Sequence, residues 1–190
     1  LNLNGHTLTK IGTGDATINN QLNTGGGALV GFGGTIAGSG LIGGDLINVS
    51  STVAPGNSPG ELKVTGDYLQ GEEASLKMEL AGGNNYDVLL VGGTASLDGT
   101  LQVSLLDGFD PASGEQFQLL LATDLVGQFD TVDLPVLSGN LAWDTTQLYA
   151  TGSISVVPEP SAACLFIVSL FVAVASRLAR ISHTNGYRSA

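Results

Sequence analysis

The chain has 190 residues, of which 28 are glycine and only 12% are charged. Its 17 acidic residues outnumber six basic ones and give a net charge of −11, so repulsion from phosphate backbones excludes nucleic-acid binding. Cys164 is the only cysteine, which excludes a disulfide and a thiolate metal site.

Residues 1–60 predict short β-strands that stack as successive coils. Their apolar runs are two or three residues long, with glycine or asparagine between them. Isolated hairpins of such length have little stability, whereas stacked coils bury these few aliphatic residues against one another. The runs are Thr17-Ile18, Ala28-Leu29-Val30, Thr35-Ile36, Leu41-Ile42, Leu46-Ile47 and Thr52-Val53.

Residues 61–156 predict longer strands, because apolar and polar residues alternate there with period two. In the clearest run, Leu76, Met78 and Leu80 share one face. Turn sequences rich in Gly, Asn, Asp and Pro separate the strands. No helical stripe precedes Pro158. The alternating runs are Ala74–Leu80, Thr100–Leu105 and Gln116–Leu121.

Two glycine motifs resemble functional signatures, but their surroundings do not fit. Gly38–Gly43 matches the dinucleotide motif G-x-G-x-x-G, which needs a following helix to hold the pyrophosphate. Glycine and β-branched residues follow instead. Gly56–Gly60 matches the nucleophile motif G-x-S-x-G, but Pro59 has no N–H for an oxyanion hole. We interpret the second stretch as a β-turn.

Other catalytic and metal patterns are weak. His6 and His183 are too far apart in sequence to suggest a zinc site, and neither Asp107 with Asp110 nor Asp130 with Asp133 forms a calcium loop. The tryptophan and three tyrosines could either line a sugar site or pack in the core, and the sequence favours packing. These residues are Trp143, Tyr68, Tyr86 and Tyr149. The sequence therefore predicts no catalytic residue, no metal site and no cofactor.

The C-terminal stretch differs from the rest. Pro158-Glu159-Pro160 ends any strand, and the apolar run that follows carries no charge from Ser161 to Ser176, directly before Arg177. Eighteen helical residues span roughly 27 Å at about 1.5 Å each, close to the roughly 30 Å of a membrane interior. The following arginines would face the cytoplasm, with the acidic body outside. The sequence thus predicts a single C-terminal transmembrane helix over 161–178.

Val157-Pro158-Glu159-Pro160, the apolar run, and Arg177 and Arg180 together resemble the PEP-CTERM sorting signal. The arginines are more widely spaced here than in that family, and a tail of residues 181–190 follows them. The resemblance implies export, transient membrane anchoring and processing near Pro160 by an exosortase-type enzyme, in bacteria that make extracellular polysaccharide.

The body carries a second, looser resemblance, to autotransporter-associated β-strand repeats and passenger β-helices. Leu3–Gly12, Thr52–Gly60, and Tyr86–Leu89 with Gly99–Leu101 carry it. It implies an all-β fold, a right-handed parallel β-helix (solenoid) with a β-rich C-terminal section. We therefore expect solenoid coils over 1–60, the β-rich end of the solenoid over 61–156 and the sorting signal over 157–190.

These patterns together predict a non-catalytic surface or extracellular-matrix protein, adhesive in character. It would be membrane-anchored with its body outside the cytoplasm, or released after processing. Leu1 is not followed by a signal peptide, so we expect the chain to be part of a longer protein. Two alternatives stay open: a carbohydrate- or calcium-binding module, and a β-helix polysaccharide lyase or hydrolase. Expected partners are the membrane, the exosortase-type enzyme and extracellular polysaccharide.

Overall fold

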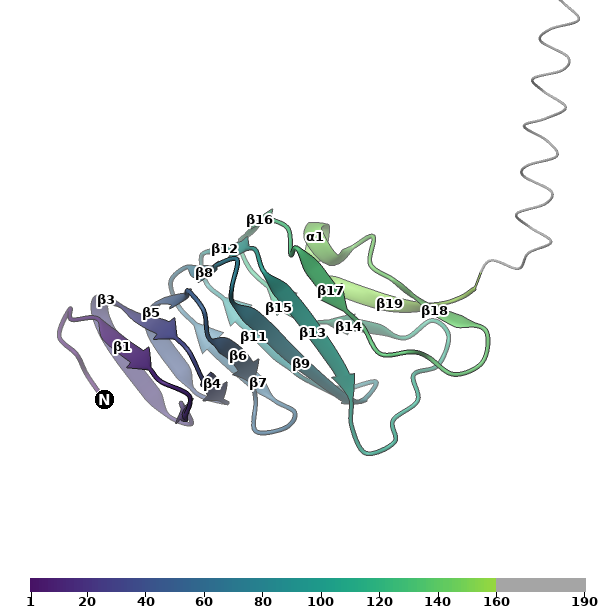
Figure 1. The fold of residues 1–190 in the computed structure, drawn as a ribbon, viewed down its shortest axis with the longest axis horizontal. Helices are drawn as coiled ribbons and strands as arrows, with labels where there is room; N and C mark the ends of the chain where they lie inside the picture. The colour runs from purple at the N-terminus through teal and green to yellow at the C-terminus, as the bar shows by residue number, and fades with distance from the viewer. Residues whose placement is uncertain (160–190) are drawn as a thin grey trace, which may run out of the picture. The chain divides into compact units, whose positions relative to one another are not determined.

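The computed structural model describes residues 1–159, which form an all-β body (Figure 1). Its nine-stranded sheet, here sheet A, is parallel and curls like half a barrel. Sheet A contains β1 (Leu8–Ile11), β3 (Gln21–Phe32), β5 (Leu41–Asn48), β7 (Glu61–Val64), β8 (Tyr68–Gln70), β11 (Val88–Val91), β12 (Thr94–Leu97), β15 (Leu120–Leu121) and β16 (Asp124–Gly127).

Two further sheets complete the body. Sheet B has seven strands, all parallel except for the short β10, and sheet C has three strands. Sheet B contains β2 (Asp15–Thr17), β4 (Thr35–Gly38), β6 (Thr52–Pro55), β9 (Ser75–Gly82), β10 (Asn85–Tyr86), β13 (Thr100–Leu105) and β17 (Thr131–Asp133). Sheet C contains β14 (Gln116–Gln118), β18 (Leu141–Asp144) and β19 (Ser153–Pro158), with the single-turn helix α1 (Leu148–Thr151) before β19.

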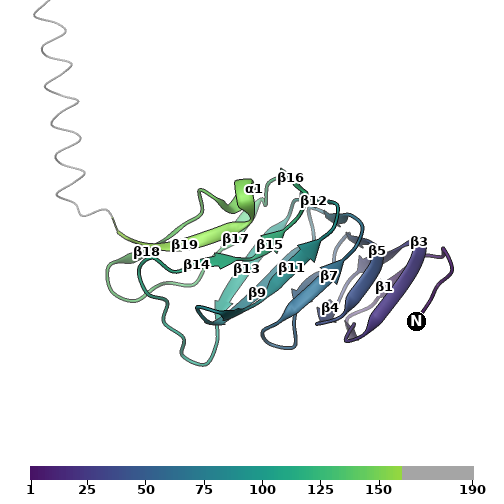
Figure 2. The same cartoon turned by 180° about the vertical axis from the view of Figure 1, so that it is seen from behind.

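The chain passes repeatedly from sheet A to sheet B, and each passage adds parallel strands to both sheets. The later passages add two strand segments to sheet A, such as β7 and β8. Leu89 of β11, for example, pairs with Leu62 of β7 on one side and with Leu120 of β15 on the other. Figure 2 shows from behind how the strands of sheet A follow one another. Stacking of this kind makes each coil depend on its neighbours for burial.

Alternating side chains from the two parallel sheets fill the core between them. In β9 the sequence alternation holds: Leu76, Met78 and Leu80 are fully buried. Their neighbours along β4, β6 and β13, which include Ile36, Val53 and Leu101, are equally inaccessible. Period two in the sequence therefore located the inner face of sheet B correctly.

The fold-class prediction, a right-handed parallel β-helix followed by a single transmembrane helix, is contradicted. The structure has three sheets, including the curled sheet A and the separate sheet C, whose β14 and β19 are antiparallel. Gly66 lies between β7 and β8, and Gly92-Gly93 lies between β11 and β12, where the chain of sheet A is divided into two strand segments. No helix within residues 1–159 is long and apolar enough to cross a membrane. The predicted span 161–178 lies outside the described residues.

A repeated Gly-Asp pair shapes the bend in sheet A. Asp45 Oδ1 accepts the Asp67 N–H at 2.9 Å, and Asp67 Oδ1 accepts the Thr94 N–H at 2.8 Å. A Cβ at Gly93 would lie 2.1 Å from Asp67 Oδ1, so a larger residue there would push the Asp67 carboxylate away from the Thr94 N–H. Each aspartate thus ties its own bend to the bend of the next coil.

Buried amides hold the opposite corner, where the chain passes from sheet A to sheet B. Asn48 Nδ2 donates to the Ser75 carbonyl at 3.2 Å, and its Oδ1 accepts the Ser51 N–H at 3.0 Å. One coil later, Gln70 Nε2 donates to the carbonyls of Asp98 and Thr100 at 2.7 and 3.0 Å. These bonds satisfy polar groups that would otherwise be costly to bury, and they fix where the sheet B strands begin.

Sheet C is attached to the body through a close backbone contact at Gly152. This residue follows α1 with a φ of 76°, and a Cβ on it would lie 1.8 Å from the Leu120 carbonyl oxygen. The positive φ and the contact both require glycine.

We expect Gly152→Ala to lower the free energy of unfolding by about 2 kcal/mol or more, because both the backbone strain and the clash must be relieved. Urea unfolding of the purified protein measures this change. Gly14→Ala is the matched control, since a Cβ there meets no atom within 4 Å. Equal stability of the two variants would contradict the assignment.

Candidate functional site

The first predicted residues of the sorting signal lie at the end of the described body. Val157 and Pro158 are the last two residues of β19, and Glu159 follows that strand. Pro158 and Glu159 are exposed, whereas Val157 is half-buried. Pro160, Arg177 and Arg180 lie outside the described residues, so the signal as a whole stays a prediction.

The two glycine motifs lie in β structure. Gly38 ends β4, and the continuation after Gly40 is β5, so no helix opens on the G-x-G-x-x-G stretch. Gly56–Gly60 joins β6 to β7 as a turn whose tip, Asn57 and Ser58, is exposed, with Ser58 at a φ of 66°. The interpretation of both stretches as turns and strands is confirmed.

The G-x-S-x-G turn nevertheless lies over a hydrogen-bonded cluster of polar side chains. Asp87 is 1% exposed, and its Oδ1 accepts the Gly60 N–H while its Oδ2 accepts the Glu79 N–H, both at 2.8 Å. Glu79 in turn accepts from Ser58 Oγ at 2.6 Å and from Lys77 Nζ at 2.8 Å. The four residues Ser58, Lys77, Glu79 and Asp87 are here called the carboxylate cluster.

The two carboxylates of this cluster have opposite pKa shifts. Burial raises the pKa of Asp87 from 3.8 to about 6, aided by the nearby Glu79 charge and opposed by the two backbone N–H donors and by Lys77. Desolvation also acts upward on Glu79, but hydrogen bonds from Lys77 and Ser58 together outweigh it and hold the pKa of that carboxyl below its usual value. Glu79 is therefore charged at neutral pH, and Asp87 titrates near pH 6.

Every oxygen of the two carboxylates already has a donor within the protein. The Ser58 hydroxyl donates to Glu79 and meets no imidazole, because the described histidine, His6, is exposed near the N-terminal end. A shallow pocket of about 270 Å³ adjoins the cluster, and Ser58, Glu79 and Asp87 line part of it. The geometry joins the 56–60 turn to β9 and offers no activated nucleophile.

Sequence reasoning missed this cluster, although one signal was present. Asp87 is a single acidic residue placed directly before the apolar run Val88–Val91, where a charged residue has to be either exposed or paired. Its partners, Gly60 and Glu79, are 27 and 8 residues away in sequence. No local pattern indicates those distances.

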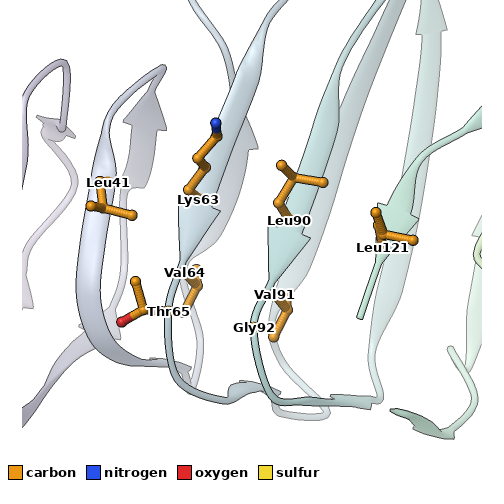
Figure 3. Close-up of a pocket in the computed structure, with 8 residues that line it drawn as sticks. All are labelled: Leu41, Lys63, Val64, Thr65, Leu90, Val91, Gly92 and Leu121. Carbon is orange, nitrogen blue, oxygen red and sulfur yellow. The ribbon is translucent and has the colours of Figure 1, made fainter. Parts of the chain in front are cut away.

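A second hollow lies on the outer face of sheet A (Figure 3). Leu41, Lys63, Leu90 and Leu121 are consecutive partners across β5, β7, β11 and β15, and they line a groove of about 370 Å³. Lys63 forms an ion pair with Glu61 at 2.8 Å, and both side chains are about half exposed. The groove offers apolar contacts and one charged residue, Lys63, whose charge is paired with Glu61. It contains no catalytic group.

The aromatic residues considered for a sugar site belong to the core. Tyr68 is fully buried and donates to Gln70 at 2.6 Å, and Tyr149 packs at the side of Phe129. Tyr86 and Trp143 both contact the Phe117 ring, and Trp143 Nε1 donates to the Pro135 carbonyl at 2.8 Å. These contacts favour the packing interpretation over an aromatic sugar platform.

The loop aspartates do not converge. Asp110 accepts two contacts from the Ser138 hydroxyl, at 2.8 and 2.6 Å, and is not grouped with Asp107 around a cation position. Within residues 1–159, no group of three or more His, Cys, Asp or Glu side chains has a metal-binding arrangement.

Comparison of the chain with protein-family models and with curated proteins found no match. The resemblances carried by residues 157–180 and by the glycine-rich body therefore remain predictions. The function has to be argued from the arrangement of the residues themselves.

Proposed function

We propose that this chain is a non-catalytic surface or extracellular-matrix protein, exported from the cytoplasm and sorted by its C-terminal residues. The observation that carries the proposal is the position of Pro158 and Glu159. They are exposed immediately after β19, the last strand of the body. A processing enzyme that recognises Pro-Glu-Pro needs an accessible, extended substrate of this kind.

The body supports a role based on its surfaces. The carboxylate cluster has its oxygens occupied by protein donors, so it stabilises a turn. Residues 1–159 carry the three lysines and all 17 acidic residues, a net charge of −14. Such a charge favours solubility and disfavours polyanionic partners.

Cell fractionation tests the proposal. When the gene is expressed in a bacterium that has an exosortase-type enzyme, we expect the protein in the envelope or the medium. Its intact mass should be shortened to an end near Pro160. Changing Pro158, Glu159 and Pro160 together to alanine should leave the full mass, because the recognition residues are lost.

Val136→Ala is the control for this experiment, since Val136 is 95% exposed and lies outside the predicted signal. Processing of this variant should match that of the wild type. Recovery of full-length wild-type protein in the cytosol alone would overturn the proposal.

A further inference from the structure

A row of hydroxyl side chains crosses the outer face of sheet B. The parallel register pairs Thr35 with Thr52, Thr52 with Ser75, Ser75 with Thr100 and Thr100 with Thr131. One hydroxyl residue therefore occupies the same position in five successive strands, which Figure 1 shows in order as β4, β6, β9, β13 and β17. These five residues are here called the hydroxyl row.

The hydroxyl row points away from the core. The residue after each member in sequence is directed inward, and Ile36, Val53, Leu76 and Leu101 are all fully buried. Because successive side chains in a strand alternate between faces, the hydroxyl residues lie on the outer face. Thr131 is exposed and the other four are partly exposed.

No hydroxyl of the row forms a hydrogen bond to another described residue, whereas the backbone around the row is held firmly. The Ser75 and Thr100 carbonyls accept from Asn48 and Gln70 inside the body, at 3.2 and 3.0 Å. The row thus presents free donors and acceptors on a fixed backbone. Its five strands are about 4.8 Å apart, which gives roughly 19 Å from first to last.

The charges near the row indicate an uncharged ligand. Lys77 and Glu79 of β9 also face outward, and they neutralise each other in an ion pair at 2.8 Å. Asp15 and Asp133 lie at the two ends of the sheet, in β2 and β17. Glu72, Glu73, Asp98 and Asp130 lie in the turns just before β9, β13 and β17, so the surroundings of the row are acidic and repel polyanions.

We propose that the hydroxyl row binds an extended neutral polysaccharide whose chain runs across the strands. A hydroxyl both donates and accepts hydrogen bonds, as sugar hydroxyls do, and a repeating row suits a ligand with repeating units. A protein partner would need a central aromatic or apolar anchor, and the row contains none. The proposal rests on the proposed function, because such a surface meets extracellular polysaccharide only after export.

Sedimentation of the purified full chain with insoluble cellulose, xylan or chitin tests this site. We expect the wild type to bind at least one of the three. Thr52→Val, Thr100→Val and Ser75→Ala combined should weaken that binding about tenfold or more, because three polar contacts are lost. Valine keeps the shape and strand preference of threonine, so circular dichroism should be unchanged.

Thr9→Val, Thr94→Val and Ser96→Ala combined form the matched control, because this set makes the same changes on sheet A. Its binding should equal that of the wild type. The proposal is overturned if the wild type binds none of the three polysaccharides, if both triple variants bind equally well, or if polygalacturonate, a polyanion, binds better. Fractionation is measured separately, so a failure to bind leaves the export proposal intact.

Discussion

Replacing Phe117 with alanine is expected to lower the free energy of unfolding by about 3–5 kcal/mol, the usual cost of removing a buried phenylalanine. Phe117 is fully buried in β14. Its ring meets Tyr86, Phe109 and Trp143 edge-on, at centroid distances of 5.3, 6.1 and 5.9 Å. The alanine variant would leave a cavity where sheet C packs on the rest of the body.

Urea unfolding followed by tryptophan fluorescence measures this change directly. Trp143 is the only tryptophan in the chain and contacts the ring that is removed, so its native emission should also shift to longer wavelength. Phe32→Ala is the control, because Phe32 is 49% exposed, and it should cost much less. An equal loss in both variants would show that Phe117 is not the centre of this packing.

Removing the Asp87 carboxylate is expected to have the second-largest effect. Asp87→Ala leaves the N–H groups of Gly60 and Glu79 without their acceptor, and each unsatisfied buried group costs about 1–3 kcal/mol. We therefore expect a loss of about 2–6 kcal/mol in urea unfolding. Loosening should be greatest in the 56–60 turn, where hydrogen exchange of the Gly60 amide should accelerate.

The pH dependence separates the charge of Asp87 from its hydrogen bonds. Because burial raises its pKa from 3.8 to about 6, the folded protein holds the proton more tightly than the unfolded chain. The stabilisation that comes from this tighter proton binding is fully present below pH 3.8 and is lost as the pH rises through about 6. Lys77, Glu79 and Ser58 are the polar groups that surround it.

Asp87→Asn cannot titrate, so its stability should fall less than that of the wild type between pH 4 and pH 7. Urea unfolding at both pH values measures the difference. Asp133→Asn makes the same change of charge at an exposed position of β17 and should keep the wild-type pH dependence. Identical pH dependence in Asp87→Asn and the wild type would contradict the assigned titration.

The candidate sites illustrate how far sequence reasoning reaches. The G-x-S-x-G stretch could be recognised as a turn from its Pro, Gly and Asn residues, and the structure places it between β6 and β7. The hydrogen bond from the Gly60 N–H of this turn to Asp87 could not be recognised, since it joins residues 27 positions apart in sequence. The hydroxyl row could not be recognised from the sequence either. Coils of unequal length place its threonines and its serine at irregular intervals along the chain.

The sequence by itself determined the all-β class and the inner face of β9 and β13, because period two is a local property of the chain. Leu76, Met78 and Leu80 were assignable to the core on that basis alone. The predicted run Gln116–Leu121 was wrong as a single strand, since it divides into β14 of sheet C and β15 of sheet A and leaves Leu121 52% exposed. Only the tertiary structure decided how the strands form three sheets, where sheet A curls and which side chains align across coils. Strand register and the pairing of buried polar groups depend on contacts between residues that are distant in sequence. No short stretch of sequence therefore predicts them.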